Sequence, residues 1–189
     1  MTKTGIFGGS FNPIHNGHIQ LARQLREAAG LDEVWLMVSP QNPLKEQTGL
    51  LADELRLQMA RQALAGEPFV RVSDYEFHLP KPSYTWNTLQ ALKTDFPDRE
   101  FVLLIGGDNW ARFSRWYRAV DIVSNYRLVV YPRRGSDIDL TTLPASVTVV
   151  NAELLDISST DIRRRVRHSQ SVKDLVPDSI LDAVTEYYQ

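Results

Sequence analysis

Residues 5–18 read Gly-Ile-Phe-Gly-Gly-Ser-Phe-Asn-Pro-Ile-His-Asn-Gly-His, the most informative stretch of the chain. The apolar run at 4–7 stops at two glycines, and a turn over 10–13 follows it. His15 and His18 then open an amphipathic segment whose apolar residues recur with a helical period. A strand, a glycine turn and a helix in this order predict one unit of a parallel α/β sheet.

The same stretch carries residue types that bind phosphate. Gly8 and Gly9 let the backbone approach a phosphate closely, because no Cβ blocks it. His15 and His18 are three residues apart, so both side chains face one way at a helix N-terminus. Orphan N–H groups and a partial positive charge at that end favour anions. Together these features indicate a site for a polyphosphate in reaction.

Two simpler interpretations remain open at this point. A Gly-Gly pair after a strand is often only a tight turn. Two histidines at this spacing could instead ligate a metal, but the chain has no cysteine and only two further histidines, His78 and His168. A structural zinc site needs about four ligands. We therefore expect no metal site built from the protein's own residues.

The composition is typical of one globular domain. The chain has 189 residues, of which 43% are hydrophobic and 23% are charged, enough to bury a sizeable core. A net charge of −2 offers no broad attraction to nucleic acid or to an anionic membrane. The sequence shows no cysteine, no signal-peptide pattern and no apolar run of about 20 residues. We expect a cytoplasmic protein with no nucleic-acid or membrane partner.

Strand and helix patterns alternate along the chain. Strands separated by helices imply right-handed crossovers. The fold class is therefore predicted as α/β, a Rossmann-like doubly wound parallel sheet with helices on both faces. We expect a single domain over 1–189, with a C-terminal helical part from about 158 to 189. The predicted strands are 3–7, 33–38, 69–73, 101–105, 127–131 and 147–150, and the predicted helices are 17–29, about 51–64, 83–92 with Ser83 as N-cap, 159–167 and 178–188.

A second glycine pair, Gly106-Gly107, follows the strand predicted at 101–105 and precedes Asp108. Ligands of doubly wound sheets bind at the carboxyl ends of the strands. Because both glycine pairs lie at strand carboxyl ends, we expect them to converge on one crevice.

Near the C-terminus, residues 157–163 read Ile-Ser-Ser-Thr-Asp-Ile-Arg. Ser158 or Ser159 can cap a helix, and Asp161 in its first turn suits the helix dipole. Taken alone, the segment favours an ordinary capped helix. Arg163, one turn further, could reach an anion held at that helix end. The next arginines are interpreted as a solvated face: Arg164, Arg165 and Arg167.

Together, 8–18 and 157–163 resemble the paired signatures of the nicotinate/nicotinamide mononucleotide adenylyltransferases, which belong to the HxGH nucleotidyltransferase superfamily. The resemblance is greatest to the bacterial branch that prefers nicotinate mononucleotide. It departs at Leu44, where that branch usually has His, and at 77–82, which lacks an Arg often found there. The likeness continues in order through nearly the whole chain, at 40–45, Asp74, Glu76, 83–85, 106–109 and Trp116.

The resemblance implies that the chain transfers the adenylyl group of ATP to nicotinate mononucleotide, giving deamido-NAD and pyrophosphate in NAD biosynthesis. The 5′-phosphate of the mononucleotide is already an anion. Catalysis is therefore expected to rest on positioning and charge neutralisation, without a strong general base. Mg²⁺ would be carried by the ATP phosphates and water, because it uses few protein carboxylates.

The resemblance also implies roles for single residues. His15, His18 and Arg163 would be catalytic. Trp116 would stack on the pyridine ring, and Thr85 and Tyr117 would bind the nicotinate carboxylate through backbone N–H groups, while Lys45 would contact the substrate. ATP would contact Gly8, Gly9, Ser10, Phe11, His18, Gly106, Asp108, Arg134, Ser158, Ser159 and Arg163, with Asp108 accepting hydrogen bonds from ribose hydroxyls.

Other functions have to be weighed against this one. The nearest is a dual-specificity or nicotinamide-preferring adenylyltransferase. Phosphopantetheine adenylyltransferase usually has Asp before the Pro and Thr at the position of His15, and choline- or glycerol-phosphate cytidylyltransferases differ at Asn12. Outside the enzymes, the alternatives are a zinc-binding module and a nucleotide-binding regulator with a dead site, although the catalytic positions are intact. The oligomeric state stays open, a homo-oligomer included.

Overall fold

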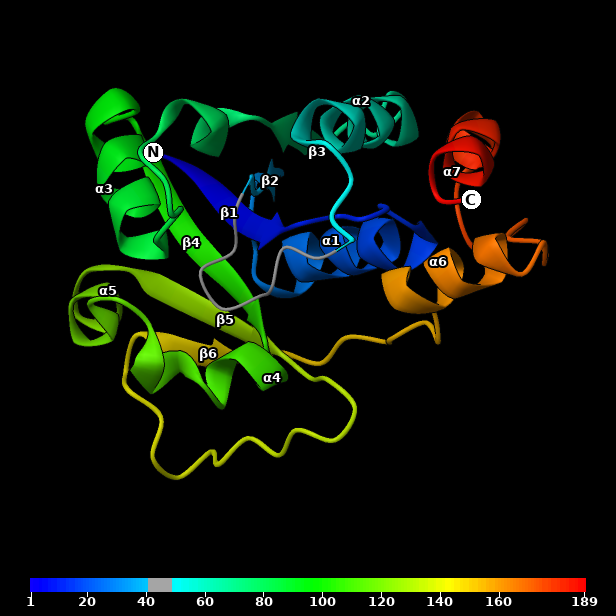
Figure 1. Ribbon diagram of the computed structural model, residues 1–189. Helices are drawn as coiled ribbons and strands as arrows, with labels where there is room; N and C mark the ends of the chain where they lie inside the picture. The colour runs from blue at the N-terminus through cyan, green and yellow to red at the C-terminus, as the bar shows by residue number, and fades with distance from the viewer. Residues whose placement is uncertain (41–48) are drawn as a thin grey trace.

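The computed structural model describes residues 1–40 and 49–189. In these ranges the strands form one parallel sheet in the order β3-β2-β1-β4-β5-β6 (Figure 1). The chain thus starts at the centre, winds out to one edge and returns to wind out to the other, which is the doubly wound topology. The strands are β1 (Thr2–Gly9), β2 (Glu33–Val38), β3 (Val70–Ser73), β4 (Arg99–Gly106), β5 (Arg127–Tyr131) and β6 (Val147–Val149).

Helices cover both faces of the sheet (Figure 1). The orange helix near the end of the chain lies beside α1, whereas the two termini, marked N and C, lie on opposite sides of the view. The α-helices are α1 (Asn16–Ala28), α2 (Asp53–Ala63), α3 (Thr85–Asp95), α4 (Gly107–Trp110), α5 (Ala119–Asn125), α6 (Ser159–Arg167) and α7 (Leu181–Tyr187), and the short 3₁₀ helices are η1 (Tyr75–His78), η2 (Phe113–Arg115) and η3 (Asp178–Ile180).

Alternation along the central strands divides the core into two layers. Ile6 and Phe7 are neighbours in β1 and point to opposite faces. Phe7 belongs to the cluster formed with α1, α2, α6 and α7. Ile6 belongs to the cluster formed with α3 and α5, where Leu89 and Ile122 are fully buried. Strands buried on both faces read as continuous apolar runs, as the sequence shows at 102–105.

The predicted fold class is confirmed, with local corrections. Ser83 does not cap a helix, because α3 begins two residues later and its N-cap position is Tyr84. The short helices α4, η2 and α5 were not predicted, since three to seven residues are too few to show a helical period. The helix predicted at 178–188 is a 3₁₀ turn followed by α7.

The two glycine pairs meet where the winding direction changes. β1 and β4 are adjacent and parallel, with Phe7 opposite Leu104. Gly9 and Gly106, each two residues further on, therefore leave the sheet at the same level. This gap between β1 and β4 is the switch point at which doubly wound folds bind ligands.

Candidate active site

The turn after β1 is held in place through its carbonyl groups. The Ser10 carbonyl accepts a hydrogen bond from Arg56 Nη1 at 2.5 Å, the Asn12 carbonyl from Arg163 Nη1 at 2.7 Å, and the Pro13 carbonyl from Ser159 Oγ at 2.8 Å. In a planar peptide unit the C=O and the following N–H point in opposite directions. The N–H of Phe11 is therefore directed away from buried Arg56.

The same hydrogen bonds bring the two signature segments together. The hydrogen bonds from Ser159 and Arg163 join α6 to the turn after β1 across about 150 residues of sequence. Ser158 is the N-cap of α6, and its Oγ accepts from the Asp161 N–H at 3.1 Å. Burial lowers the pKa of Arg163 from its usual value. The side chain stays in the range where a guanidinium is cationic.

His15 and His18 open α1 as a reciprocal cap. The His15 Nδ1 accepts from the His18 N–H at 3.4 Å, and the His18 Nδ1 accepts from the His15 N–H at 3.2 Å. Because each Nδ1 is an acceptor, we assign the ring proton to Nε2 in both residues. The rings stack with their centroids 3.6 Å apart. A Cβ on Gly17 would lie 3.0 Å from the His15 ring, so a glycine between the histidines makes room for this stack.

The two histidines differ in burial. Burial, together with the charge of Arg133, lowers the pKa of His15 to about 4. His15 is therefore an uncharged donor at neutral pH. His18 is more exposed, and its ring packs edge-on to Phe11 at 4.9 Å. A Cβ on Gly9 would lie 3.1 Å from the Phe11 ring, so a glycine at this position leaves room for the ring.

At the second glycine pair, Arg133 approaches the crevice, next in sequence to the predicted Arg134. Arg133 lies with its Nε 3.6 Å from Asp108 Oδ1 and is close enough to act on the pKa of His15. Arg134, the predicted ATP contact, forms an ion pair with Asp156 at 3.0 Å, and 71% of its side chain is exposed. Its contact with ATP stays a prediction. Side chains two apart on an extended chain share a face. Arg133 is two residues after Tyr131, the last residue of β5. This spacing was the sequence signal that could have placed Arg133 on the same side as Tyr131.

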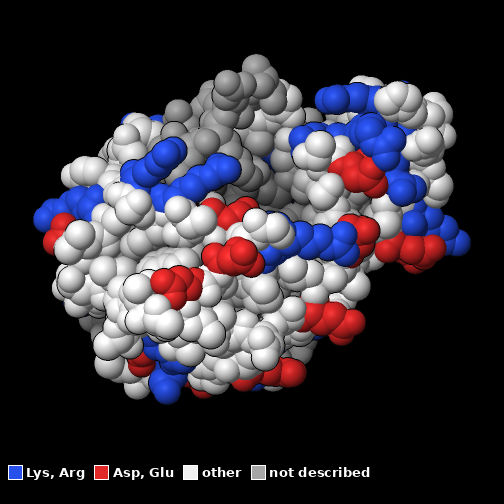
Figure 2. All heavy atoms as spheres, turned by 90° about the horizontal axis from the view of Figure 1, so that it is seen from below, with Lys and Arg blue, Asp and Glu red and all other residues white. Residues whose placement is uncertain are grey.

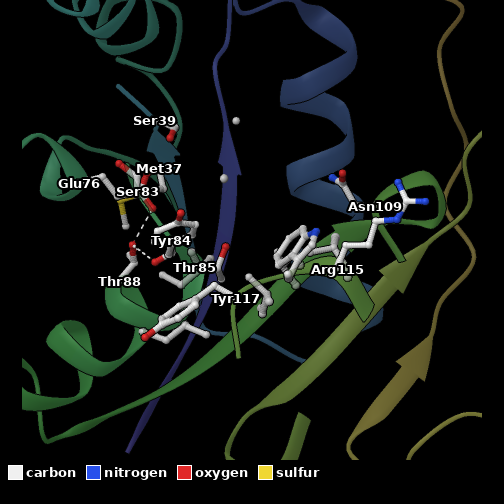
Figure 3. Close-up of a pocket in the computed structure, with 18 of the residues that line it drawn as sticks. Met37, Ser39, Glu76, Ser83, Tyr84, Thr85, Thr88, Asn109, Arg115 and Tyr117 are labelled. Atoms are coloured by element: carbon white, nitrogen blue, oxygen red, sulfur yellow. Dashed lines mark hydrogen bonds between the residues drawn. The ribbon is translucent and has the colours of Figure 1, made fainter. Parts of the chain in front are cut away.

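A cavity adjoins the turn after β1 and reaches to the start of α3 (Figure 3). Its volume of about 140 Å³ is close to that of an engineered cavity of about 150 Å³ that binds benzene. Thr85, Trp116 and Tyr117, the predicted substrate contacts, all line it. Ser83 Oγ and Trp116 Nε1 are buried there without a hydrogen-bond partner among the described residues.

Both ends of the cavity carry polar side chains, and one of them holds the buried carboxyl group of Glu76. Figure 3 shows Glu76, Ser83 and Thr88 together at this end, with Asn109 and Arg115 at the other. Glu76 is buried and accepts a hydrogen bond from Thr88 Oγ1 at 2.8 Å. Burial raises the pKa of Glu76, while hydrogen bonds from Thr88 and Ser39 act in the opposite direction. A buried carboxyl group and a buried hydroxyl without a partner can both hydrogen-bond to a polar group on a bound ligand.

The remaining predicted residues have varied positions. Gly8 and Gly9 line the cavity, and a Cβ on Gly8 would meet nothing within 4 Å. Gly106 is not open in this way, because a Cβ there would collide with Asp108 and Arg133. Lys45 lies outside the described residues. Sequence reasoning missed fully buried Arg56, because a lone arginine in a helix usually reads as solvent-exposed.

In the part of the chain that the structure describes, no three His, Asp or Glu side chains gather as a metal site. In the same ranges, no helix is long and apolar enough to cross a membrane.

Figure 2 shows Lys and Arg side chains around a hollow on one face, interspersed with Asp and Glu. The donors that converge on the turn after β1 are therefore imidazole, guanidinium and backbone N–H groups, all of which suit an anion.

Comparison with known proteins agrees with this geometry. The family model described as cytidylyltransferase-like matches residues 6–165. The chain belongs to this family. A relative from Bacteroides fragilis named "Probable nicotinate-nucleotide adenylyltransferase" is 53% identical over 172 residues, which are 91% of this chain and 86% of the relative. One of the same name from Bacteroides thetaiotaomicron is 47% identical over 98% of this chain and 92% of its own length.

The fold of this family member also matches a solved structure. The nicotinic acid mononucleotide adenylyltransferase of Plasmodium falciparum, complexed with NaAD, superposes with a TM-score of 0.82. The alignment covers 99% of this chain and 96% of that one at 20% sequence identity. At this identity the likeness establishes the fold alone.

Proposed function

We propose that the protein transfers the adenylyl group of ATP to nicotinate mononucleotide, forming deamido-NAD and releasing pyrophosphate. An oxygen of the mononucleotide 5′-phosphate attacks the α-phosphorus of ATP, and the bond to the β-phosphate oxygen breaks. The observation that carries the proposal is that α6 and α1 meet at one turn, beside a cavity of pyridine-ring size. The named relatives support the same reaction.

The site residues fit a mechanism of positioning and charge neutralisation. The attacking phosphate is already ionised, so no side chain has to remove its proton. Arg163 supplies a cation, and His15 and His18 supply Nε2–H donors at the N-terminus of α1. Such preorganised donors stabilise the charge that develops on phosphoryl oxygens in the transition state. Because His15 is uncharged, its contribution does not depend on taking up a proton.

Mg²⁺ fits this donor set as a component of the nucleotide. The side chains that meet at the turn are donors to anions, with Asp108 as the carboxylate near them. When bound, the metal would neutralise charge on the ATP phosphates, since Mg²⁺ keeps waters and uses few protein carboxylates. The cytoplasmic location, the single-domain organisation and the oligomeric state stay predictions.

The carboxylate or carboxamide substituent of the pyridine ring is proposed to lie at the end of the cavity that holds Glu76. Thr85 is the first residue of α3, so its N–H has no partner within the helix and the dipole favours an anion there. Tyr117, two residues after the end of η2, also lines the cavity. Glu76 favours a second candidate, the nicotinamide form, because an ionised carboxyl group attracts an NH₂ donor and repels a carboxylate.

A single experiment tests both candidates. Pyrophosphate release is measured with ATP and each mononucleotide side by side, at equal concentrations and with Mg²⁺ present. We expect release with both and higher kcat/KM for nicotinate mononucleotide. The absence of release with either mononucleotide would refute the proposed function. A higher kcat/KM with nicotinamide mononucleotide would refute the nicotinate preference alone.

A further inference from the structure

Asn12 is the point at which three other segments join the turn after β1. Its Oδ1 accepts hydrogen bonds from Tyr188 Oη at 2.7 Å and from the Leu51 N–H at 3.2 Å. Its Nδ2 donates to the Gly49 carbonyl at 2.9 Å. Its own carbonyl accepts from Arg163 Nη1 at 2.7 Å. The side chain of Asn12 is thus fixed by three bonds, and its backbone holds the guanidinium of Arg163.

Tyr188 reaches this point from the end of α7. It is 5% exposed, and its hydroxyl bond to Asn12 is buried. Burial raises the pKa of the Tyr188 hydroxyl, while the nearby charges of Arg56 and Arg163 act to lower it. The hydroxyl is therefore protonated at neutral pH and is the donor in its bond to Asn12. It lies close to both guanidinium groups that hold the turn.

The helix that carries Tyr188 is firmly packed. Val184 in α7 and Ile180 in η3 are fully buried and belong to the same core cluster as Phe11 and Ile14. The Tyr188 N–H donates to the Val184 carbonyl at 3.3 Å. Because a buried side chain on a packed helix has little freedom, its hydroxyl is a fixed reference for Asn12.

We propose that Tyr188 is a positioning residue for Arg163. Its hydroxyl fixes the amide of Asn12, which fixes the Asn12 carbonyl and hence the guanidinium bound to it. This inference rests on the proposed function, in which Arg163 acts on the transferring phosphoryl group. Tyr188 itself touches no substrate in this scheme.

Tyr188→Phe removes the hydroxyl and keeps the buried ring. We expect kcat to fall about three- to tenfold, the factor that corresponds to one hydrogen bond. The KM for nicotinate mononucleotide should be unchanged, because the cavity around Trp116 does not involve Asn12. Tyr187→Phe is the matched control: it is the same chemical change one residue away, and none of the described residues hydrogen-bonds to the Tyr187 hydroxyl. This control should retain wild-type kcat.

A double-mutant cycle separates positioning from a general structural role. If Tyr188 acts through Arg163, Tyr188→Phe should cause no further loss of kcat in an Arg163→Ala background. Equal losses in both backgrounds would overturn the inference. So would wild-type kcat in the single variant.

Hydrogen exchange gives a readout independent of activity. In Tyr188→Phe, amide exchange should accelerate in peptides covering 9–16 and 49–55, and Tyr187→Phe should leave these peptides unchanged. Unchanged exchange in both variants would refute the coupling, whatever the reaction catalysed. Faster exchange together with a wild-type enzyme that does not adenylylate either mononucleotide would instead refute the proposed function.

Discussion

His15 and His18 stack with their ring centroids 3.6 Å apart, and the Nδ1 of each accepts the backbone N–H of the other. This arrangement uses both Nδ1 acceptors for the helix cap, so the ring proton of each histidine is assigned to Nε2. It also explains why two histidines can lie together without repulsion, since His15 is uncharged at neutral pH. In the proposed mechanism, the two rings that cap α1 would also bind the anion.

Replacement of His15 should make stability less dependent on pH. The His15 pKa is about 4 in the folded protein and 6.5 in the unfolded chain. Between these values only the unfolded chain binds the proton, so stability falls as pH drops below 6.5. Going from pH 7.5 to 5, this single group should cost about 2 kcal/mol. The His15→Asn variant can still cap the helix. Between pH 7.5 and 5, its free energy of unfolding in urea should fall by about 2 kcal/mol less than that of the wild type.

The control for this measurement is His78→Asn. His78 is 74% exposed, and the same substitution there should preserve the wild-type loss of stability. If His15→Asn and wild type lose the same free energy of unfolding, then His15 is not buried in its neutral form.

Loss of the phosphate donors should reduce turnover strongly. Arg163→Ala and His18→Ala should each lower kcat about 10²- to 10³-fold, since each removes a donor to the developing charge. Arg167→Ala is a suitable control, because this exposed arginine lies one turn further along α6. It should retain wild-type kcat. Steady-state kinetics with saturating ATP tests all three, and a near-normal kcat would remove that residue from the catalytic set.

Local sequence signals predicted the central strands, both glycine turns, the α1 and α6 starts and the histidine pair. These depend on residues close in sequence, such as the apolar run before Gly8. Contacts between distant residues could not be predicted. Tyr188 and Asn12 are 176 positions apart, and fully buried Arg56 looks like a surface residue until three carbonyls surround it.

Neighbouring residues of the same type were also indistinguishable. The sequence did not indicate that Arg133, and not Arg134, lies near Asp108, because this depends on which side of the loop faces that residue. Ser83 is a favoured capping residue by type. Tertiary packing instead places its hydroxyl in the cavity without a partner.

Mg²⁺ should bind with the nucleotide. The described residues include no cluster of three potential metal-ligating side chains, and Mg²⁺ usually coordinates substrate phosphates. Activity should therefore require Mg²⁺, whereas isothermal calorimetry of the nucleotide-free protein should show weak binding. Tight binding without nucleotide would contradict this expectation and would point to a carboxylate site.

Glu76→Gln should increase the preference for nicotinate over nicotinamide mononucleotide. The substitution keeps an oxygen acceptor for Thr88 Oγ1 but removes the negative charge that repels a carboxylate. We expect the ratio of kcat/KM values to rise about three- to tenfold. Burial raises the Glu76 pKa. As pH rises through this raised pKa, Glu76 ionises and the wild-type ratio should fall, whereas the ratio of the Glu76→Gln variant should stay constant. Exposed Glu54→Gln is the control, and a ratio unchanged by Glu76→Gln contradicts the prediction.

Selectivity in the wild-type enzyme should come from the substituent and not from the ring. Both pyridinium rings carry the same positive charge and could stack equally well on Trp116. A carboxylate only accepts hydrogen bonds, whereas a carboxamide also presents an NH₂ group. An NH₂ turned toward the N–H groups of Thr85 and Tyr117 would stay unpaired, at a cost of about 1–3 kcal/mol. We expect kcat/KM to favour nicotinate mononucleotide at least about tenfold.

Trp116→Ala separates the two contributions. Loss of stacking should raise KM for both mononucleotides by a similar factor and leave most of the ratio intact. The ratio is measured from initial rates of pyrophosphate release with each substrate in wild type and variant. If Trp116→Ala abolishes the preference, then discrimination acts through the ring. Equal kcat/KM values in the wild-type enzyme would refute the backbone clamp at Thr85 and Tyr117, even with the adenylyl transfer itself intact.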